Sequence, residues 1–416
     1  MSAAVKHGDP RANFDGFRRM TKGRLRLLVL STHPVQYATP IFRLIANDPR
    51  IEIQVAYCSM QGAEPAIDPG FQVEVKWDVP LLDGYRWVHL RNRFGKPRLG
   101  SFFGLVNTEI WRLIRRGNFD GVLLYTGYIY ATFWIAVAAA KLSGTAVLFG
   151  TDATSYEPRD HKRWKVLVKK ALLPSVLRLA DVVTMPSEAS RRFAMGMGLP
   201  EARVIVTPFV VDNEWWGRQA EQVDRVATRK KWNIPENASV ALFCAKLQSW
   251  KRPQDALRAF AAANVKNSYL VFAGDGALRE SLEAEARSLG INERVRFLEF
   301  VNQSGLPEVY SASDVLVLPS EYEPFGVVVN EAMLCSCPAI VSDRVGAGLD
   351  LVKSGITGFV YPCGDVDALA KILFSVLGDF DKIEQLGRAA KLQMESWSER
   401  ESVDAIFRAV ERARND

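Results

Sequence analysis

Short apolar runs alternate along the chain with longer amphipathic stretches, and this alternation restricts the folds that the chain can adopt. Many of the runs consist of Val, Ile, Leu and Phe over their whole length, as residues 27–30 and 315–318 do. That composition is typical of strands buried on both faces of a parallel sheet. Because helical patterns fill the intervals, the sequence predicts repeated β-α units and an α/β fold.

The predicted strands fall into two series. They span residues 25–30, 51–57, 121–125, 145–149, 181–184 and 204–206, and then residues 240–243, 269–272, 295–298, 315–318 and 339–341. The strand pattern lapses between residues 211 and 238, where the chain is polar. We therefore place an interdomain linker near residues 211–222, in a chain of 416 residues that is long enough for two or three domains.

Composition argues against several classes of protein. No apolar run approaches the ~18 residues of a membrane span, and residues 1–23 are polar and basic without the apolar segment of a secretory signal. Five irregularly spaced cysteines and four scattered histidines fit no disulfide or metal pattern, so we expect no metal site and a cytoplasmic protein. The net charge of +6 favours anionic partners, but no basic-aromatic motif is present and we expect no nucleic acid partner.

One strand–turn–helix segment carries two glutamates. The strand at residues 315–318 runs into a turn with Glu323 and Gly326, and Glu331 lies about one turn into the helix that follows. Ligands of open α/β sheets bind at the carboxyl ends of the strands, and the first N–H groups of a helix can donate to hydroxyls or phosphates. Either glutamate alone is consistent with a structural charge, but this setting favours a binding site.

Two lysines, Lys246 and Lys251, stand five residues apart after the first strand of the second series. Converging cations would stabilise the charge that develops on a departing diphosphate, although any surface loop can carry two solvated lysines. The next strand ends in a glycine-containing turn, Ala273-Gly274-Asp-Gly.

These segments resemble the motifs of glycosyltransferase family 4, a large family of retaining enzymes with the GT-B fold. The stretch from Glu323 to Glu331 resembles the family's E-x7-E signature, and Gly274 lies in a turn that the family shares; the resemblance covers roughly residues 203–397. It implies that Glu323 lies at the donor's sugar ring and that Glu331 binds the ribose hydroxyls of the nucleotide. The backbone that faces the donor sugar would belong to Pro324, Phe325, Gly326 and Val327.

The chain departs from the family at several of these positions. In the pattern G-R-L-x-x-x-K-G, whose Arg and Lys grip the diphosphate, Lys246 replaces the Arg and Arg252 replaces the final Gly. A point charge thereby replaces a planar, bidentate guanidinium. In the loop S-x-x-G-G-x-x-E-x-V, whose backbone meets the donor phosphates, Gly346 matches, and Ala347 and Asp350 replace the second Gly and the Glu.

The loop after the first strand reads Ser-Thr-His-Pro-Val-Gln-Tyr, where many family members carry a Gly-Gly loop. It resembles a subgroup with an H-P-x-Q-Y opening that is common among polysaccharide-assembly transferases. The resemblance implies that His33 and Gln36 lie where the acceptor meets the leaving phosphate, although a histidine that hydrogen-bonds the backbone explains His33 equally well. Asp152 stands roughly where typical members carry a histidine, so an acid/base role at that position stays open.

The GT-B fold implies two Rossmann-like domains whose parallel sheets face each other across a cleft. We expect a basic N-terminal extension at residues 1–23, an acceptor-side domain formed by residues 24–210 with 398–416, and a nucleotide-sugar-binding domain at residues 211–397. The implied activity is transfer of a sugar, with retention, from a nucleotide-diphosphate sugar to a saccharide or lipid-linked acceptor in polysaccharide or glycoconjugate biosynthesis. We expect no cofactor besides the donor and no metal, since no D-x-D pair follows a strand.

Residues 161–180 contain six cations among scattered apolar residues. A basic amphipathic helix can lie on anionic lipid, and it can equally pack on the protein with a solvated basic face. Peripheral contact with the inner face of the membrane through residues 161–180 is therefore one of two interpretations.

Two other functions share these motifs. A sugar-nucleotide epimerase or hydrolase of the same fold would need its own acid/base residues in the first domain. A catalytically inactive homologue would bind the donor without turnover, and the replacements at Lys246 and Asp350 are consistent with that alternative.

Overall fold

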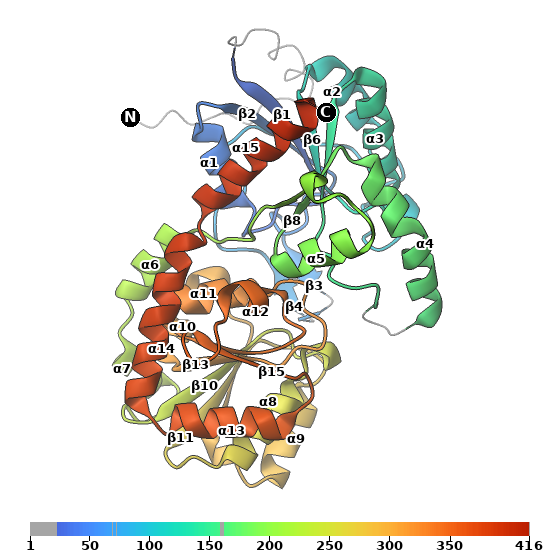
Figure 1. The fold of residues 1–416 in the computed structure, drawn as a ribbon. Coiled ribbons are helices and arrows are strands. Elements are labelled where there is room, and N and C mark those ends of the chain that lie inside the picture. The colour runs from blue at the N-terminus through green and yellow to red at the C-terminus, as the bar shows by residue number, and fades with distance from the viewer. Residues whose placement is uncertain (1–22, 69, 72, 159–161, 416) are drawn as a thin grey trace.

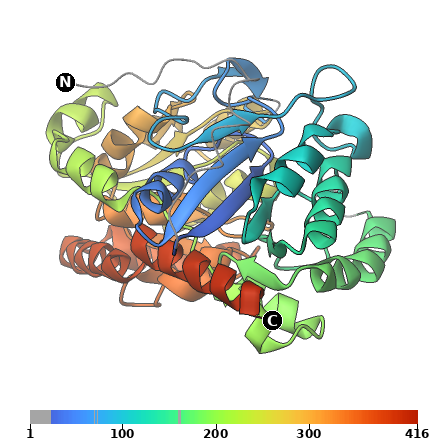
Figure 2. The ribbon, with the colours of Figure 1, turned by 90° about the horizontal axis from the view of Figure 1, so that it is seen from above.

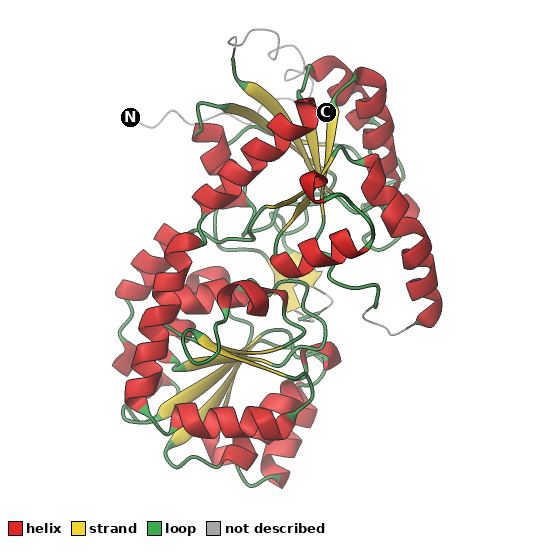
Figure 3. Cartoon of the chain, in the orientation of Figure 1, coloured by secondary structure: helices red, strands yellow, loops and turns green. Residues whose placement is uncertain are grey.

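The computed structural model describes residues 23–68, 70–71, 73–158 and 162–415. The basic extension expected at residues 1–23 lies outside the described residues except for Gly23. The described chain folds into two α/β units, the upper and lower halves of Figure 1, in which helices flank parallel sheets (Figure 3). The predicted fold class, two α/β units with parallel sheets, is confirmed.

The first sheet has seven strands among the described residues, in the order β5-β2-β1-β6-β7-β8-β9, and every pair is parallel. Its strands are β1 (Leu25–Ser31), β2 (Ile51–Tyr57), β5 (Trp87–His89), β6 (Gly121–Tyr125), β7 (Ala146–Gly150), β8 (Val182–Met185) and β9 (Val204–Val206). Its helices are α1 (Thr39–Asn47), α2 (Glu109–Gly117), α3 (Ala131–Ser143), α4 (Arg163–Leu179) and α5 (Glu188–Gly196). Between β2 and β5 the chain forms a separate antiparallel hairpin of β3 (Ala66–Asp68) and β4 (Val73–Val75).

The second sheet has six parallel strands in the described part of the chain, in the order β12-β11-β10-β13-β14-β15. Its strands are β10 (Ser239–Cys244), β11 (Ser268–Ala273), β12 (Val295–Leu298), β13 (Val315–Leu318), β14 (Ala339–Ser342) and β15 (Gly358–Tyr361). Its helices are α7 (Arg225–Lys231), α8 (Pro253–Ala263), α9 (Arg279–Ser288), α10 (Leu306–Ala312), α11 (Val328–Leu334), α12 (Gly346–Leu351), α13 (Val366–Leu377) and α14 (Phe380–Gln393).

Strand β10 explains why continuous apolar runs predicted these sheets. Val240 and Leu242 belong to the hydrophobic cluster on one face of the second sheet, and Ala241 and Phe243 belong to the cluster on the other face. Successive side chains of a strand point to opposite faces, so a strand with helices on both sides needs an apolar residue at every position. All six residues of β10 are buried.

The stretch expected to be an interdomain linker is largely a helix. Helix α6 (Asn213–Glu221) packs against α10 and α11 of the second domain and buries Trp216, which is 1% exposed. The side chain of Asp212 caps the helix by accepting a hydrogen bond of 2.8 Å from the backbone N–H of Trp215. This amphipathic helix was not predicted, because the stretch is polar in composition and its buried face consists mainly of one large aromatic side chain.

The last helix, α15 (Glu399–Asn415), returns from the second domain to the first. It packs against α1, β7 and β8, and it crosses the first sheet in Figure 2. Its apolar residues Val403, Ile406, Ala409 and Val410 join the hydrophobic cluster formed by the strands of that sheet.

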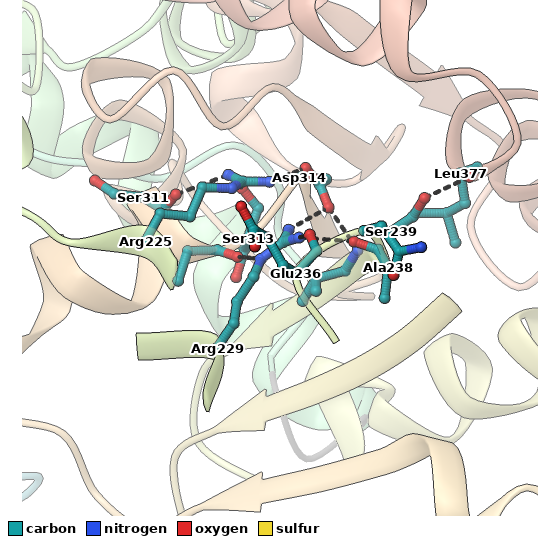
Figure 4. Close-up of polar contacts among 12 residues, drawn as sticks. Arg225, Arg229, Glu236, Ala238, Ser239, Ser311, Ser313, Asp314 and Leu377 are labelled. Carbon is teal, nitrogen blue, oxygen red and sulfur yellow. Dashed lines mark hydrogen bonds and ion pairs between the residues drawn. The ribbon is translucent and has the colours of Figure 1, made fainter. Parts of the chain in front are cut away.

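A buried ionic cluster lies at the amino end of β10 and β13 (Figure 4). The carboxylate of Asp314 pairs with Arg225, pairs with Arg229 at 2.7 Å, and accepts a hydrogen bond of 2.6 Å from the backbone N–H of Val240. Arg229 also donates to the carbonyl oxygens of Ala312, Glu236 and Ala238 at 2.7 to 2.9 Å. The cluster therefore ties α7 to two central strands.

Candidate active site

The loops that follow β10 and β13 meet at the carboxyl end of the second sheet. The side chain of Lys251, in the turn Ser249–Lys251 after β10, forms an ion pair with the carboxylate of Glu323 in the loop after β13. The backbone N–H of Glu321 donates to the carbonyl oxygen of Trp250 at 2.8 Å, so the two loops are also joined through their backbones. Lys251 and Glu323, predicted from separate motifs, are thus in direct contact.

A third loop, after β14, is joined to the loop of Glu323. The N–H groups of Gly346 and Ala347 donate to the carbonyl oxygens of Glu323 and Phe325 at 3.0 and 2.8 Å. A Cβ atom at Gly346 would lie 1.9 Å from the carbonyl oxygen of Pro324, so this approach requires glycine. These two N–H groups are consequently occupied by protein backbone.

The N–H groups at the start of α11 are placed differently. Gly326 has a φ of +99°, and the N–H groups of Gly326, Val327 and Val328 donate to no acceptor among the described residues. They lie directly after Glu323 and Pro324 in the chain and can therefore serve as donors to a bound molecule.

Glu331 is buried on α11 beneath the end of β10. Its Oε2 accepts a hydrogen bond of 2.8 Å from the hydroxyl of Tyr310, which lies 3.4 Å from the Sγ of Cys244. Burial raises the pKa of Glu331 to about 7, and the hydrogen bond from Tyr310 partly offsets this rise. No sequence motif indicated Tyr310, because its contact with Glu331 joins two helices and residues that are 21 positions apart.

The side chain of Lys246 contacts the first domain, whereas that of Lys251 pairs with Glu323 in the second. Its Nζ lies 2.6 Å from Oδ1 of Asp68 at the end of β3, and 4.6 Å from the centre of the Phe71 ring. The turn after β11 supports the backbone of this loop, because a Cβ atom at Gly274 would lie 2.3 Å from the carbonyl oxygen of Ala245. Sequence reasoning missed Asp68, which lies in an irregular stretch without a recognisable motif.

Arg252 occupies the position where the family pattern has glycine. Its φ of +52° is left-handed, a conformation that glycine adopts without cost. The guanidinium pairs with Asp255 at 2.7 Å and with Glu321 at 3.4 Å. These ion pairs hold a backbone geometry that the family pattern obtains from the residue type.

The predicted acceptor-side residues lie on loops at the carboxyl end of the first sheet. His33 follows β1, and burial lowers its pKa; its Nδ1 has no hydrogen-bond partner among the described residues. Asp152 follows β7. Burial, with a further contribution from the charge of Asp152, raises the pKa of Tyr37 to about 12. The loops after β1 and β7 therefore lie near each other.

Aromatic contacts join this part of the first domain to the donor loop of the second. The ring of Tyr37 lies 5.5 Å from that of Phe209, which lies 5.5 Å from that of Phe325. The carbonyl oxygen of Phe209 accepts hydrogen bonds from Asn330 and Trp397 at 2.9 and 2.7 Å. Phe209 thus connects the H-P-x-Q-Y loop with Phe325, which was predicted to face the donor.

Among the described residues, no group of three or more His, Cys, Asp or Glu side chains could hold a metal ion. In the same part of the chain, no helix is long and apolar enough to cross a membrane.

Models of two families match the chain. The family described as Glycosyltransferase Family 4 matches residues 52–215, and the family described as Glycosyl transferases group 1 matches residues 224–393. The chain is 30% identical over 295 residues to the N-acetyl-alpha-D-glucosaminyl L-malate synthase of Bacillus anthracis, a match that covers 68% of this chain and 72% of that protein.

Other curated relatives match over a shorter part of their length. An uncharacterized glycosyltransferase of Methanocaldococcus jannaschii is 33% identical over 52% of this chain and 56% of its own. The D-inositol 3-phosphate glycosyltransferase of Geodermatophilus obscurus is 28% identical over 65% of this chain and 58% of its own. The chain thus spans just over half the length of these two relatives.

Solved structures share the whole architecture. HepE of Anabaena in complex with UDP and glucose superposes with a TM-score of 0.70 at 18% identity, covering 93% of this chain and 100% of that one. Sucrose-phosphate synthase of Thermosynechococcus elongatus gives a TM-score of 0.68 at 19% identity, covering 92% and 98%. The predicted GT-B fold is confirmed.

Proposed function

The chain belongs to glycosyltransferase family 4, and from this premise we propose that it transfers a sugar, with retention, from a nucleotide-diphosphate sugar to a saccharide or lipid-linked acceptor. The observation that carries the proposal is the contact between Lys251 and Glu323. It joins the loop expected to hold the diphosphate to the loop expected to hold the sugar. HepE, which has the same fold, has been solved with UDP-glucose, UDP alone, and UDP with glucose.

On the donor side, Lys246 and Lys251 would stabilise the charge that grows on the leaving diphosphate. Glu323 would lie at the sugar ring, and the N–H groups of Gly326 and Val327, which donate to no acceptor in the described part of the chain, would donate to sugar or phosphate oxygens. Glu331 would accept hydrogen bonds from the ribose hydroxyls. Each of these groups comes from the carboxyl end of the second sheet, as expected for an open α/β sheet.

On the acceptor side, we propose that the acceptor lies against the first domain near His33, Gln36 and Asp152. The leaving phosphate would take the acceptor proton on the same face of the sugar, so the reaction needs no covalent nucleophile. The aromatic contacts from Tyr37 through Phe209 to Phe325 support this arrangement, because they bring the two loops towards a common boundary.

A donor panel followed by product analysis tests this function. UDP, GDP and ADP are compared by thermal shift, since a ligand that prefers the folded state raises its melting temperature. The best nucleotide's sugar derivatives are then assayed with saccharide and lipid-linked acceptors, and proton NMR reads the anomeric configuration of the first product. An inverted product would rule out retention, and tight donor binding without turnover would favour an inactive homologue. We expect activity to survive excess EDTA.

We further propose that α4 contacts the cytoplasmic face of an anionic membrane. Its exposed apolar residues Trp164, Leu167, Val168 and Leu172 follow one another at intervals of three, one and four positions and share one face of the helix, with cations on either side. Trp164 and Leu167 are 60% and 69% exposed, which a helix packed on the protein does not require. Co-sedimentation with vesicles of phosphatidylglycerol should be lost in Trp164→Ser/Leu167→Ser, whereas equal binding would refute the contact.

A further inference from the structure

The hairpin of β3 and β4 crosses from the first domain to the second. Figure 1 shows it between the two halves of the molecule, although its strands belong to neither main sheet. We call the described residues from Ala66 to Asp78 the strap. None of the sequence motifs described above includes it.

Three residues of the segment after β12, Phe300, Asn302 and Ser304, fasten the strap to the second domain. The ring of Phe300 lies 4.7 Å from that of Phe71 and 6.4 Å from that of Trp77. The side chain of Asn302 donates to the carbonyl oxygen of Lys76 at 2.7 Å. The backbone N–H of Ser304 donates to Asp78 at 3.1 Å. These contacts do not involve Lys246, so the strap can stay docked when Lys246 exchanges its partner.

At the end of the strap next to Lys246, the carboxylate of Asp68 is paired with the ammonium group that is proposed to bind the donor diphosphate. Its Oδ1 lies 2.6 Å from Nζ of Lys246 and accepts hydrogen bonds from the N–H groups of Gly70 and Phe71 at 2.8 and 3.0 Å. Burial alone would raise the pKa of Asp68, but the bonds from Lys246, Phe71 and Gly70 bring it below its ordinary value. The carboxylate is therefore ionised and fixed in place as an anionic partner of Lys246.

The backbone of the strap also covers the lysine. A Cβ atom at Gly70 would lie 2.6 Å from Cδ and 2.9 Å from Nζ of Lys246, so the strap touches the side chain along its length. The side chains of Lys246 and Asp68 are still 32% and 26% exposed, and an ion pair with that exposure is weak enough to exchange with a ligand.

We propose that Asp68 is a specificity-determining residue of the donor site, whose carboxylate holds Lys246 until a diphosphate displaces it. This rests on the proposed function, because it assumes that Lys246 binds the diphosphate. A diphosphate carries more negative charge than one carboxylate and so competes well for the lysine, whereas a nucleoside without phosphate does not. Once Asp68 has been displaced, the contacts at Phe300, Asn302 and Ser304 keep the strap over the bound phosphates.

Calorimetry on the full chain tests the proposal with three probes: the best-bound of UDP, GDP and ADP, its parent nucleoside, and inorganic pyrophosphate. In Asp68→Asn, removal of the competing charge should tighten binding of the nucleoside diphosphate and of pyrophosphate by about two- to fivefold. The nucleoside should bind unchanged. Glu74→Gln is the matched control, because Glu74 is an exposed carboxylate on the same hairpin and is paired in register with Ile67 rather than with Lys246.

A double-mutant cycle with Lys246→Ala gives the second readout. The gain from Asp68→Asn should vanish in the Lys246→Ala background, with melting temperatures confirming that each variant is folded. Unchanged or weaker diphosphate binding in Asp68→Asn would contradict the proposal that Asp68 competes with the diphosphate for Lys246. It would instead indicate that Asp68 positions Lys246. If Glu74→Gln tightened diphosphate binding by the same factor, the gain in Asp68→Asn would come from the change in net charge and not from the loss of the ion pair with Lys246. If no variant binds any diphosphate, the proposed function falls as well.

Discussion

The charged groups at the two ends of the second sheet differ in how many partners they have within the protein. At the amino end, the buried carboxylate of Asp314 is bound by Arg225, Arg229 and the N–H of Val240, and Arg229 donates to three carbonyl oxygens as well. At the carboxyl end, among the described residues, Lys246 and Lys251 each have one carboxylate partner.

This difference separates a structural ion cluster from a binding site. An ammonium group has three donors and a carboxylate about four acceptor positions. The groups at the amino end use most of theirs within the protein, so a ligand would find little to bind. Those at the carboxyl end keep bonding capacity, and they can exchange a weak internal partner for a substrate.

Breaking the amino-end cluster should give the largest change in stability. Arg229→Ala leaves the Asp314 carboxylate with too few partners in a buried place, and we expect the free energy of unfolding to fall by about 3–5 kcal/mol. Urea denaturation measures this change. Arg225→Ala is the matched control and should cost less, because the side chain of Arg225 is 41% exposed and that of Arg229 only 2%. A loss in Arg229→Ala below that of the control would contradict the comparison.

At the carboxyl end, the same kind of change should affect turnover instead. Lys251→Ala, and likewise Lys246→Ala, should lower kcat by about a hundredfold while KM changes less, because the charge that the lysines stabilise grows in the transition state. Steady-state kinetics with the identified donor measures both parameters. Lys231→Ala, which removes an exposed lysine paired with Glu308, serves as the control. Near-normal turnover in the double variant would show that the diphosphate is held elsewhere.

Glu331 allows a finer test, because it is both buried and proposed to bind the ribose. Glu331→Gln loses a charged acceptor worth about 1.5–3 kcal/mol, so nucleotide affinity should fall at least about tenfold in calorimetry. An unchanged affinity would exclude the ribose contact.

The pH dependence of stability tests the burial of Glu331 independently. Its pKa is raised from 4.5 to about 7, so the folded state binds a proton more tightly than the unfolded state. This group's contribution to stability is fully present below pH 4.5 and is lost as the pH rises through 7. Glu331→Gln should remove that part of the decline in urea titrations, so the difference between wild type and variant should widen over this range. Parallel profiles would contradict the shift.

The smallest effect is expected at Arg252. Arg252→Gly relieves a left-handed backbone but removes the ion pairs with Asp255 and Glu321. The two contributions are each about 1 kcal/mol and oppose each other, so stability should change by less than about 1 kcal/mol. Ser336→Gly, at a φ of +58° and without an ion pair, gives the backbone contribution alone. A large loss in Arg252→Gly would show that Arg252 has a further role at the donor site.

The sequence predicted the sheets well because their strands are buried on both faces. Every strand of four or more residues except β15 was predicted from such apolar runs to within a residue at either end. Edge strand β5 and the strap's strands were missed, because each has only three residues and one of the three is polar, whereas the equally short β9 is apolar throughout. Lys251 and Glu323 were assigned to the donor site from separate motifs, and their contact arises because these motifs follow adjacent strands. Asp68 and Tyr310 could not be predicted, because what matters at each is a tertiary contact to one distant side chain.

The return of α15 to the first domain has a consequence for folding during synthesis. Its residues Val403, Ile406 and Val410 cover apolar side chains such as Leu27 and Val29 at the opposite end of the sequence. The first domain is therefore begun before the second and completed after it, because this part of its core stays uncovered until α15 has left the ribosome. The second domain lies between the strands of the first domain and α15 in the sequence and can fold beforehand, so a nascent chain that stalls before α15 would expose one half of the protein and not the other.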